Sequence, residues 1–238
     1  MKSGISDFSE ELLPALAEYA NMVVFSPVEV ENRAALASVE IHDLSELDDA
    51  KLRNSLDCIV YHMGNNNQYH GAILDMLLKY PGIVEIHDYG MHHLAAEKFY
   101  LGKGQDAYLK LAGYCHGERG HRIAANFLQG LARAPWETHS YDMVMNRYIL
   151  ENATGIVVHS ETAKQLALGE FPDKPIVKIL LHSEMEDRPN EFKDECRSKL
   201  GIDDKEIVIG SFGFATSAKR ILPILDALQQ IKNEPGIP

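Results

Sequence analysis

The sequence predicts an α/β protein in which helices cover both faces of a parallel sheet. Short apolar runs such as Ile83–Ile86 and Glu206–Phe212 have the length and composition of strands that are buried on both faces. Longer amphipathic segments alternate with these runs, which is typical of crossover connections between parallel strands. The 238 residues, 45% of them apolar, suffice for one large domain or two modest ones.

The N-terminal stretch predicts a helix and then a strand. A Gly/Ser/Asp turn over Met1–Ser9 leads into a helix that Ser6 or Asp7 caps, and Asn21 ends this helix before a strand over Met22–Phe25. A helix in an α/β fold normally follows a strand. We therefore expect a first strand to be missing from the N-terminus.

Two strand–helix units come next. Val39–Ile41 is a short strand, and Ser45 or Asp48 caps the short helix that follows it and ends near Ser55. Asp57–His62 is a buried strand, and a Gly/Asn turn over Met63–His70 leads into a helix that a Pro-Gly pair ends.

The strand Ile83–Ile86 ends in a polar pair, His87 and Asp88. Open parallel sheets bind ligands beyond the carboxyl ends of their strands, so this pair is a candidate site. Asp and Gly after a strand are also ordinary turn residues, and a plain turn is the alternative interpretation.

A helical insert and two more strands complete the first domain. The stretch from Met91 to Leu150 lacks a clear strand, and we expect it to fold over the site as a wall or lid. Strands follow at Ala153–His159 and Ile176–Ile179, with a helix between them that Ser160 caps. Glycines and a proline divide the insert into expected helices over residues 95–100, 106–112, 121–132 and 141–151.

The last part of the chain predicts a linker and the start of another domain. A short helix ends at Gly201, a buried strand spans Glu206–Phe212, and a helix face runs from Ile221 to Ile231. One strand–helix unit cannot bury both faces of its strand, so we expect this domain to be incomplete. The expected divisions are residues 1–185, 186–205 and 206–238.

Composition excludes several classes of protein. The net charge is −12 and no basic stripe is visible, which argues against binding to nucleic acid. Three widely spaced cysteines do not form a disulfide framework. No apolar run reaches about 18 residues and no signal peptide is present, so a cytoplasmic protein is expected. Peripheral association with the inner face of the membrane and a homodimer both stay open.

Eleven histidines raise the question of a metal. His62, His87 and His159 each end or nearly end a strand, which could bring them together at one sheet edge. The sequence contains neither H-E-x-x-H nor the nucleophile motif G-x-S-x-G. Zinc sites need three or four ligands that other residues hold in place, so no metal site is predicted. A histidine at a strand end is suited to acid–base chemistry or to hydrogen bonding instead.

Two loops rich in small residues precede helices and could hold a phosphate. The turn Gly4–Ser9 is only weak evidence for a phosphate site, and a plain helix cap is the favoured interpretation. The loop Gly213–Lys219 followed by Arg220 is a stronger diphosphate cradle, although both cations could equally be solvated.

Taken in order along the chain, these stretches resemble the retaining GT-B glycosyltransferases of family 4. The matching segments are the first loop and helix, three later strand ends and the start of the donor domain: Ser3–Leu16, Tyr61–Asn66, Pro81–Asp88, Val157–Ala163 and Gly210–Gly213 with Lys219 and Arg220.

The resemblance implies two Rossmann-like domains that face a cleft, of which the N-terminal one binds the acceptor. The enzyme would transfer a sugar from a nucleotide-sugar donor to a glycan or lipid-linked acceptor in polysaccharide biosynthesis, with retention and without a metal or cofactor. The family histidine near the transferred sugar corresponds to His87. The resemblance places Gly4, Ile5, Ser6, Lys219 and Arg220 at the donor, and it makes the following residues line the cleft: Asp7, Gly64, Asn65, Asn66, Asp88, His92, His159 and Ser160.

The sequence also departs from the family. Phe214 stands where an arginine is common, and the paired glutamates and nucleobase pocket would lie beyond residue 238. The chain is therefore expected to be truncated and inactive alone. The alternative function is a non-catalytic GT-B fragment that binds a glycan or supports a partner transferase; a GT-B epimerase or phosphorylase would share the architecture.

Overall fold

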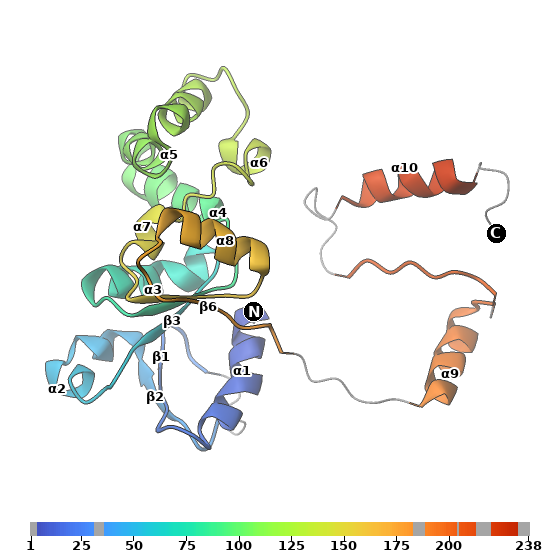
Figure 1. Cartoon of the computed structure of the whole chain (residues 1–238), viewed down its shortest axis with the longest axis horizontal. Helices are drawn as coiled ribbons and strands as arrows, with labels where there is room; N and C mark the ends of the chain where they lie inside the picture. Colours follow the sequence, from blue (N-terminus) through green and yellow to red (C-terminus); the bar gives the residue numbers. More distant parts are fainter. Residues whose placement is uncertain (1–3, 31–35, 183–188, 204, 213–219, 233–238) are drawn as a thin grey trace. The chain divides into compact units, whose positions relative to one another are not determined.

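The computed structural model describes residues 4–30, 36–182, 189–203, 205–212 and 220–232. The chain forms two compact units, Met1–Glu184 and Met185–Pro238 (Figure 1). Each unit is described below by itself.

The first unit is built around a four-stranded parallel sheet with the strand order β3-β4-β5-β6. Tyr61 pairs with Val84 across the first strand pair, and Ile83 pairs with Gly155 across the second. Helices lie between consecutive strands, so the predicted α/β parallel sheet is confirmed. The strands are β3 (Val60–Met63), β4 (Ile83–Ile86), β5 (Gly155–Val158) and β6 (Ile176–Lys178).

A second, two-stranded parallel sheet joins β1 (Val23–Ser26) to β2 (Glu40–Asp43). A small apolar cluster lies against it, with Leu13 of the first helix as a buried member. That helix, α1 (Gly4–Leu16), begins where the sequence predicted a turn, so Ser6 and Asp7 lie inside its first turn instead of capping it.

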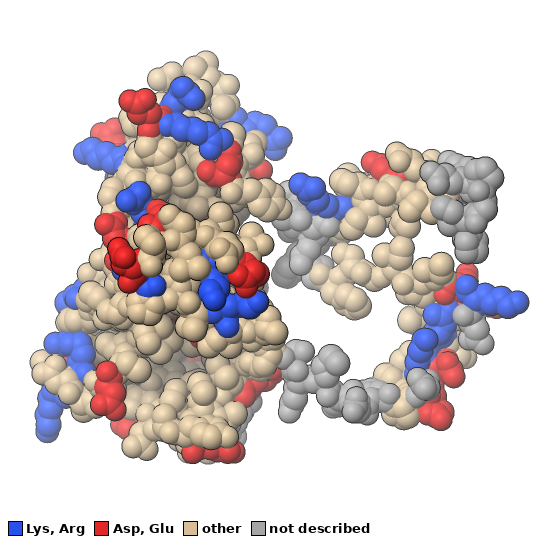
Figure 2. Space-filling view, viewed as in Figure 1, with Lys and Arg blue, Asp and Glu red and all other residues tan. Residues whose placement is uncertain are grey.

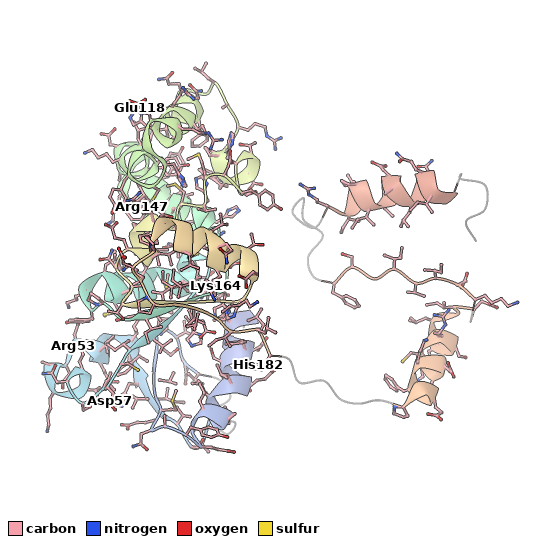
Figure 3. The ribbon with its side chains drawn as sticks, viewed as in Figure 1. Arg53, Asp57, Glu118, Arg147, Lys164 and His182 are labelled. Atoms are coloured by element: carbon pink, nitrogen blue, oxygen red, sulfur yellow. The ribbon has the colours of Figure 1, made fainter. Side chains whose placement is uncertain are left out.

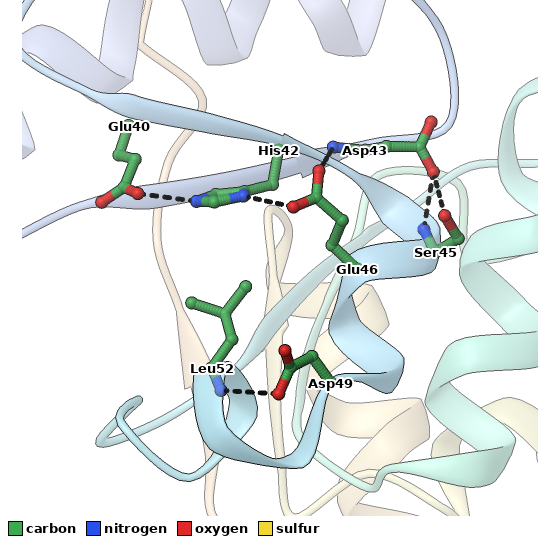
Figure 4. A network of polar contacts seen from close by, with 7 residues as sticks. All are labelled: Glu40, His42, Asp43, Ser45, Glu46, Asp49 and Leu52. Carbon is green, nitrogen blue, oxygen red and sulfur yellow. Dashed lines mark hydrogen bonds and ion pairs between the residues drawn. The ribbon is translucent and has the colours of Figure 1, made fainter.

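The short helices after β2 are capped by residues other than those predicted. Asp43 accepts a hydrogen bond from the Ser45 amide at 2.8 Å, and Glu46 accepts one from the Asp43 amide at 2.9 Å (Figure 4). This capping box begins a 3₁₀ helix, η1 (Leu44–Asp48), and Asp49 caps α2 (Ala50–Arg53). The prediction that Ser45 or Asp48 caps a helix was wrong. Asp43 and Glu46, three positions apart, together accept hydrogen bonds from two backbone amides at the start of the helix.

The remaining helices of the first unit fall into two groups. Around the sheet lie α3 (Asn67–Lys79) and α8 (Glu161–Glu170), which Asn66 and Ser160 cap. The insert between β4 and β5 contains α4 (His92–Ala95), the π-helix η2 (Ala96–Leu101), α5 (Gln105–Leu128), α6 (Pro135–Thr138) and α7 (Arg147–Leu150).

The insert contains a helix break that the sequence predicted. The helices expected over residues 106–112 and 121–132 correspond to two helical segments of α5, which meet at the non-helical backbone of Gly117 (φ 61°, ψ −152°). Glycine adopts this conformation without the steric cost of a Cβ. Of the helix expected over residues 141–151, only α7 forms, and Pro135 begins α6 because proline fits the first turn of a helix.

The second unit contains two helices among its described residues, α9 (Asn190–Leu200) and α10 (Ile221–Lys232). Gly201 ends α9 in the left-handed conformation, as the sequence predicted. The strand predicted over Glu206–Phe212 is wrong: these residues form no strand, and Ile207 and Phe212 are 78% and 87% exposed. No described strand lies beside this run to bond its backbone and cover its faces.

Two leucines of α3 allow the packing of this helix against the main core to be tested. Leu74 of α3 is fully buried in the apolar cluster, whereas Leu78 on the same helix is 42% exposed. We expect Leu74→Ala to lower the free energy of unfolding by about 3 kcal/mol, because it leaves a cavity, and Leu78→Ala to cost clearly less. Urea denaturation of both variants measures the difference, and equal losses would contradict the assigned face of α3.

Candidate functional site

A pocket of about 590 Å³ lies at the carboxyl ends of β3 and β4, beside the first turns of α1. His182, labelled in Figure 3, lies next to α1, and its Nε2 is 3.4 Å from a carboxylate oxygen of Glu11. Among the described residues that line the pocket, none belongs to the insert, so the insert does not form the expected wall. The lining residues are Gly4, Ile5, Asp7, Phe8, Glu11, Asn65, Asn66, Tyr69, His70, His87, Asp88, Leu181 and His182.

The turns after β3 and β4 are tied to each other. The Asn65 amide donates a hydrogen bond to Oδ2 of Asp88 at 3.1 Å, and the Leu94 amide donates to Oδ1 of Asn65 at 3.0 Å. Asp88 therefore holds the turn after β3 in place and also borders the pocket. Asn66 is likewise engaged, because its side chain accepts a hydrogen bond from the Gln68 amide at the start of α3.

Gly64 allows α1 to approach the sheet. A Cβ at this position would lie 2.5 Å from Cδ1 of Ile5 and 2.9 Å from Cε1 of His70. A larger residue would push the first turn of α1 away from the strand end. Gly64 therefore acts through the spacing of its neighbours, while Ile5 and His70 line the pocket itself.

Histidines from three adjacent strands meet next to the pocket, as their strand-end positions predicted. Nδ1 of His62 lies 3.2 Å from Nε2 of His87, and the rings of His87 and His159 are 4.8 Å apart. Glu85 lies between them, with its two carboxylate oxygens each 3.5 Å from a histidine nitrogen, one on His62 and one on His159.

Glu85 was missed by the sequence reasoning, although a signal was present. It is the charged residue within the apolar run Ile83–Ile86, and it is buried in the structure. A carboxylate in a buried strand needs partners that offset its desolvation. That need points to neighbouring strand ends, where the histidines lie.

Burial makes the cluster electrostatically unusual. It lowers the pKa of His62 to about 4 and that of His87 to about 3, and the neighbouring histidines contribute to both shifts. It also raises the pKa of Glu85, which His159 and His182 partly oppose. At neutral pH the imidazoles of His62 and His87 are therefore neutral.

Phe8 of α1 covers this cluster. Its ring centroid lies 4.9 Å from that of His87 and 4.5 Å from that of His182. The ring centroids of His62 and His159 are farther from it, at 6.1 and 6.0 Å. The sequence predicted Phe8 only as part of an apolar helix face. It lies against imidazoles because three of the covered strand ends carry histidine.

The other predicted site residues lie in different places. Ser160 caps α8 by accepting a hydrogen bond from the Ala163 amide. His92 is buried in the insert, where Nε2 lies 2.7 Å from the Tyr108 hydroxyl. Arg220 lies in the second unit with a φ of 51°, and Lys219 lies outside the described residues.

Two further observations bear on partners. On the face seen in Figure 2, Lys and Arg are interspersed with Asp and Glu over the first unit. Among the described residues, no helix is both long and apolar enough to cross a membrane.

Comparison with known proteins gives no relative. No protein-family model matches the sequence, and no curated protein and no solved structure matches the chain. The function must therefore be argued from the site.

The burial of His92 predicts how stability depends on pH. Burial lowers its pKa to about 3, whereas the unfolded chain binds the same proton near pH 6.5. The unfolded state binds more protons than the folded state between these pH values. The contribution of His92 to the free energy of unfolding is therefore fully present above pH 6.5 and is lost as the pH drops toward 3.

We expect the His92 contribution to the loss between pH 6.5 and 4.5 to be about 2 kcal/mol. His92→Gln keeps a polar group near Tyr108 but cannot titrate. Urea denaturation at several pH values should therefore give a shallower pH dependence for this variant, and the same slope as the wild type would contradict the assignment.

Proposed function

We propose that this chain belongs to a retaining GT-B glycosyltransferase, which transfers a sugar from a nucleotide-sugar donor to a glycan or lipid-linked acceptor. The observation that carries the proposal is that the first turns of α1 and the strand-end residues Asn65, Asn66, His87 and Asp88 line the same pocket. The Rossmann-like arrangement of two facing domains is part of the proposal.

The donor side of the proposal relies on α1. The first turn of a helix presents amide groups and the positive end of the helix dipole, which favour phosphate oxygens. Gly4 and Ile5 lie in this turn and line the pocket. Lys219 and Arg220 would add positive charge from the second unit, which offsets the leaving diphosphate without a metal.

The sugar side relies on the strand ends. Amide, carboxylate and imidazole groups recognise sugar hydroxyls through hydrogen bonds. Nε2 of His87 lies beside His62, which leaves Nδ1 as the atom for a sugar hydroxyl. A neutral imidazole suits this role, so His87 positions the transferred sugar and does not act as a charged group.

Titration calorimetry of the full-length protein with UDP-, GDP- and dTDP-sugars tests the proposal, because the proposed transferase binds the base of its donor in the second domain. We expect one of these donors to bind, and His87→Ala to weaken binding about tenfold, the effect of losing one hydrogen bond. His93→Ala, which removes an exposed histidine, is the matched control.

The proposal fails if no donor binds, or if His87→Ala and His93→Ala bind the donor equally well. Binding of a free glycan with no binding of any nucleotide sugar would favour the glycan-binding alternative. Circular dichroism confirms that each variant is folded before its affinity is compared.

A further inference from the structure

The cluster of His62, Glu85, His87 and His159 gathers several atoms that could bind a metal, and one of them, Nε2 of His159, has no hydrogen-bond partner among the described residues. His62 and Glu85 form a cross-strand pair between β3 and β4, and His87 follows β4 directly. One ligand atom from each of these three residues lies within 4.8 Å of the other two.

His159 supplies an independent observation. Its Nδ1 lies 2.9 Å from the carbonyl oxygen of Ile179, and a carbonyl can only accept, so this nitrogen carries the proton. In the neutral ring, Nε2 then bears a lone pair. This side chain is 8% exposed, and within the described part of the chain Nε2 has no hydrogen-bond partner.

The lone pair of His159 faces a carboxylate. Nε2 lies 3.5 Å from Oε1 of Glu85, and both atoms are acceptors when the ring is neutral and the carboxylate is charged. Two buried acceptors at this distance need a positive species between them or beside them. A cation meets that need for Glu85 and His159, and His62 and His87 lie close enough to supply further ligands.

The donor set matches one class of cation. Imidazole nitrogens with one carboxylate are typical zinc ligands, whereas magnesium and calcium prefer sites made of oxygen atoms. Two ligands of a tetrahedral zinc ion stand about 3.4 Å apart, since each lies near 2.1 Å from the metal. The separation of 3.2 Å between His62 and His87, and that of 3.5 Å between Glu85 and His159, are close to this value.

We propose that His62, Glu85, His87 and His159 bind one zinc ion at the carboxyl ends of β3, β4 and β5. The carbonyl of Ile179 orients the fourth ligand through Nδ1, as outer hydrogen bonds do in zinc sites. Phe8 covers the site and limits its access to water. One ligand atom each from His62, Glu85 and His87 lies within 4.8 Å of the other two, and Nε2 of His159 lies 3.5 Å from Oε1 of Glu85, so side-chain rotations would complete the coordination.

This zinc site goes beyond the proposed transferase. The sugar transfer described above needs no metal, and zinc would bind Nε2 of His87, whereas the proposed sugar contact is at Nδ1. The zinc experiment uses no nucleotide sugar, so failure to bind zinc leaves the transferase proposal intact. Failure to bind a nucleotide sugar likewise leaves the zinc proposal intact.

Zinc binding to the full chain, stripped of metal with a chelator, tests the proposal at pH 7.5. Competition with a chromophoric zinc chelator should give one ion per chain and a dissociation constant of about 1 μM or lower. Glu85→Gln and His159→Gln should each weaken binding by about tenfold or more. His93→Gln, at an exposed histidine, should bind zinc as the wild type does.

A spectroscopic readout on the wild type does not depend on whether the variants fold. Cobalt(II) in the same site should give the strong visible absorption of tetrahedral coordination, and zinc should remove it whereas magnesium should not. Absence of zinc binding, zinc binding unchanged by both Glu85→Gln and His159→Gln, or an octahedral cobalt spectrum would each overturn the proposal. If only a proton lies between Glu85 and His159, the protein would show no zinc binding.

Discussion

The parallel register of β3, β4 and β5 is the constraint on which the site depends. Parallel strands end at the same edge of the sheet, so the polar residues that follow them must share one small volume. The pairing of Tyr61 with Val84 and of Ile83 with Gly155 sets that edge. Glu85, buried one position before the end of β4, then requires polar neighbours, and the histidines of the adjacent strands supply them.

The helix α1 closes this edge from one side. Gly64 leaves room for Ile5, and the close approach of the helix brings Phe8 onto the imidazole rings. The same helix supplies its first turns to the pocket. One packing arrangement therefore serves two purposes: it covers the histidine cluster with the Phe8 ring, and it places the positive end of a helix dipole beside the strand ends.

The sequence predicted the parts of the fold that depend on local pattern. The apolar run Ile83–Ile86 forms β4 with those bounds, and Ser160 caps α8 as its position indicated. The missing strand has a non-local cause. The run Glu206–Phe212 has strand composition, but no described strand lies beside it, whereas the glycines of the insert correctly indicated the break at Gly117. For the site, strand ends indicated that His62, His87 and His159 would meet, but the role of Glu85 and the cover by Phe8 follow from packing that no local pattern encodes.

Proton NMR of the aromatic side chains tests most directly that α1 covers a cluster formed by three strand ends. With the histidine and phenylalanine rings assigned, the account predicts nuclear Overhauser contacts from the Phe8 ring to the rings of both His87 and His182, whose centroids lie within 5 Å. It also predicts that the His159 ring carries its proton on Nδ1. A Phe8 ring without contacts to any of these histidines would contradict the account.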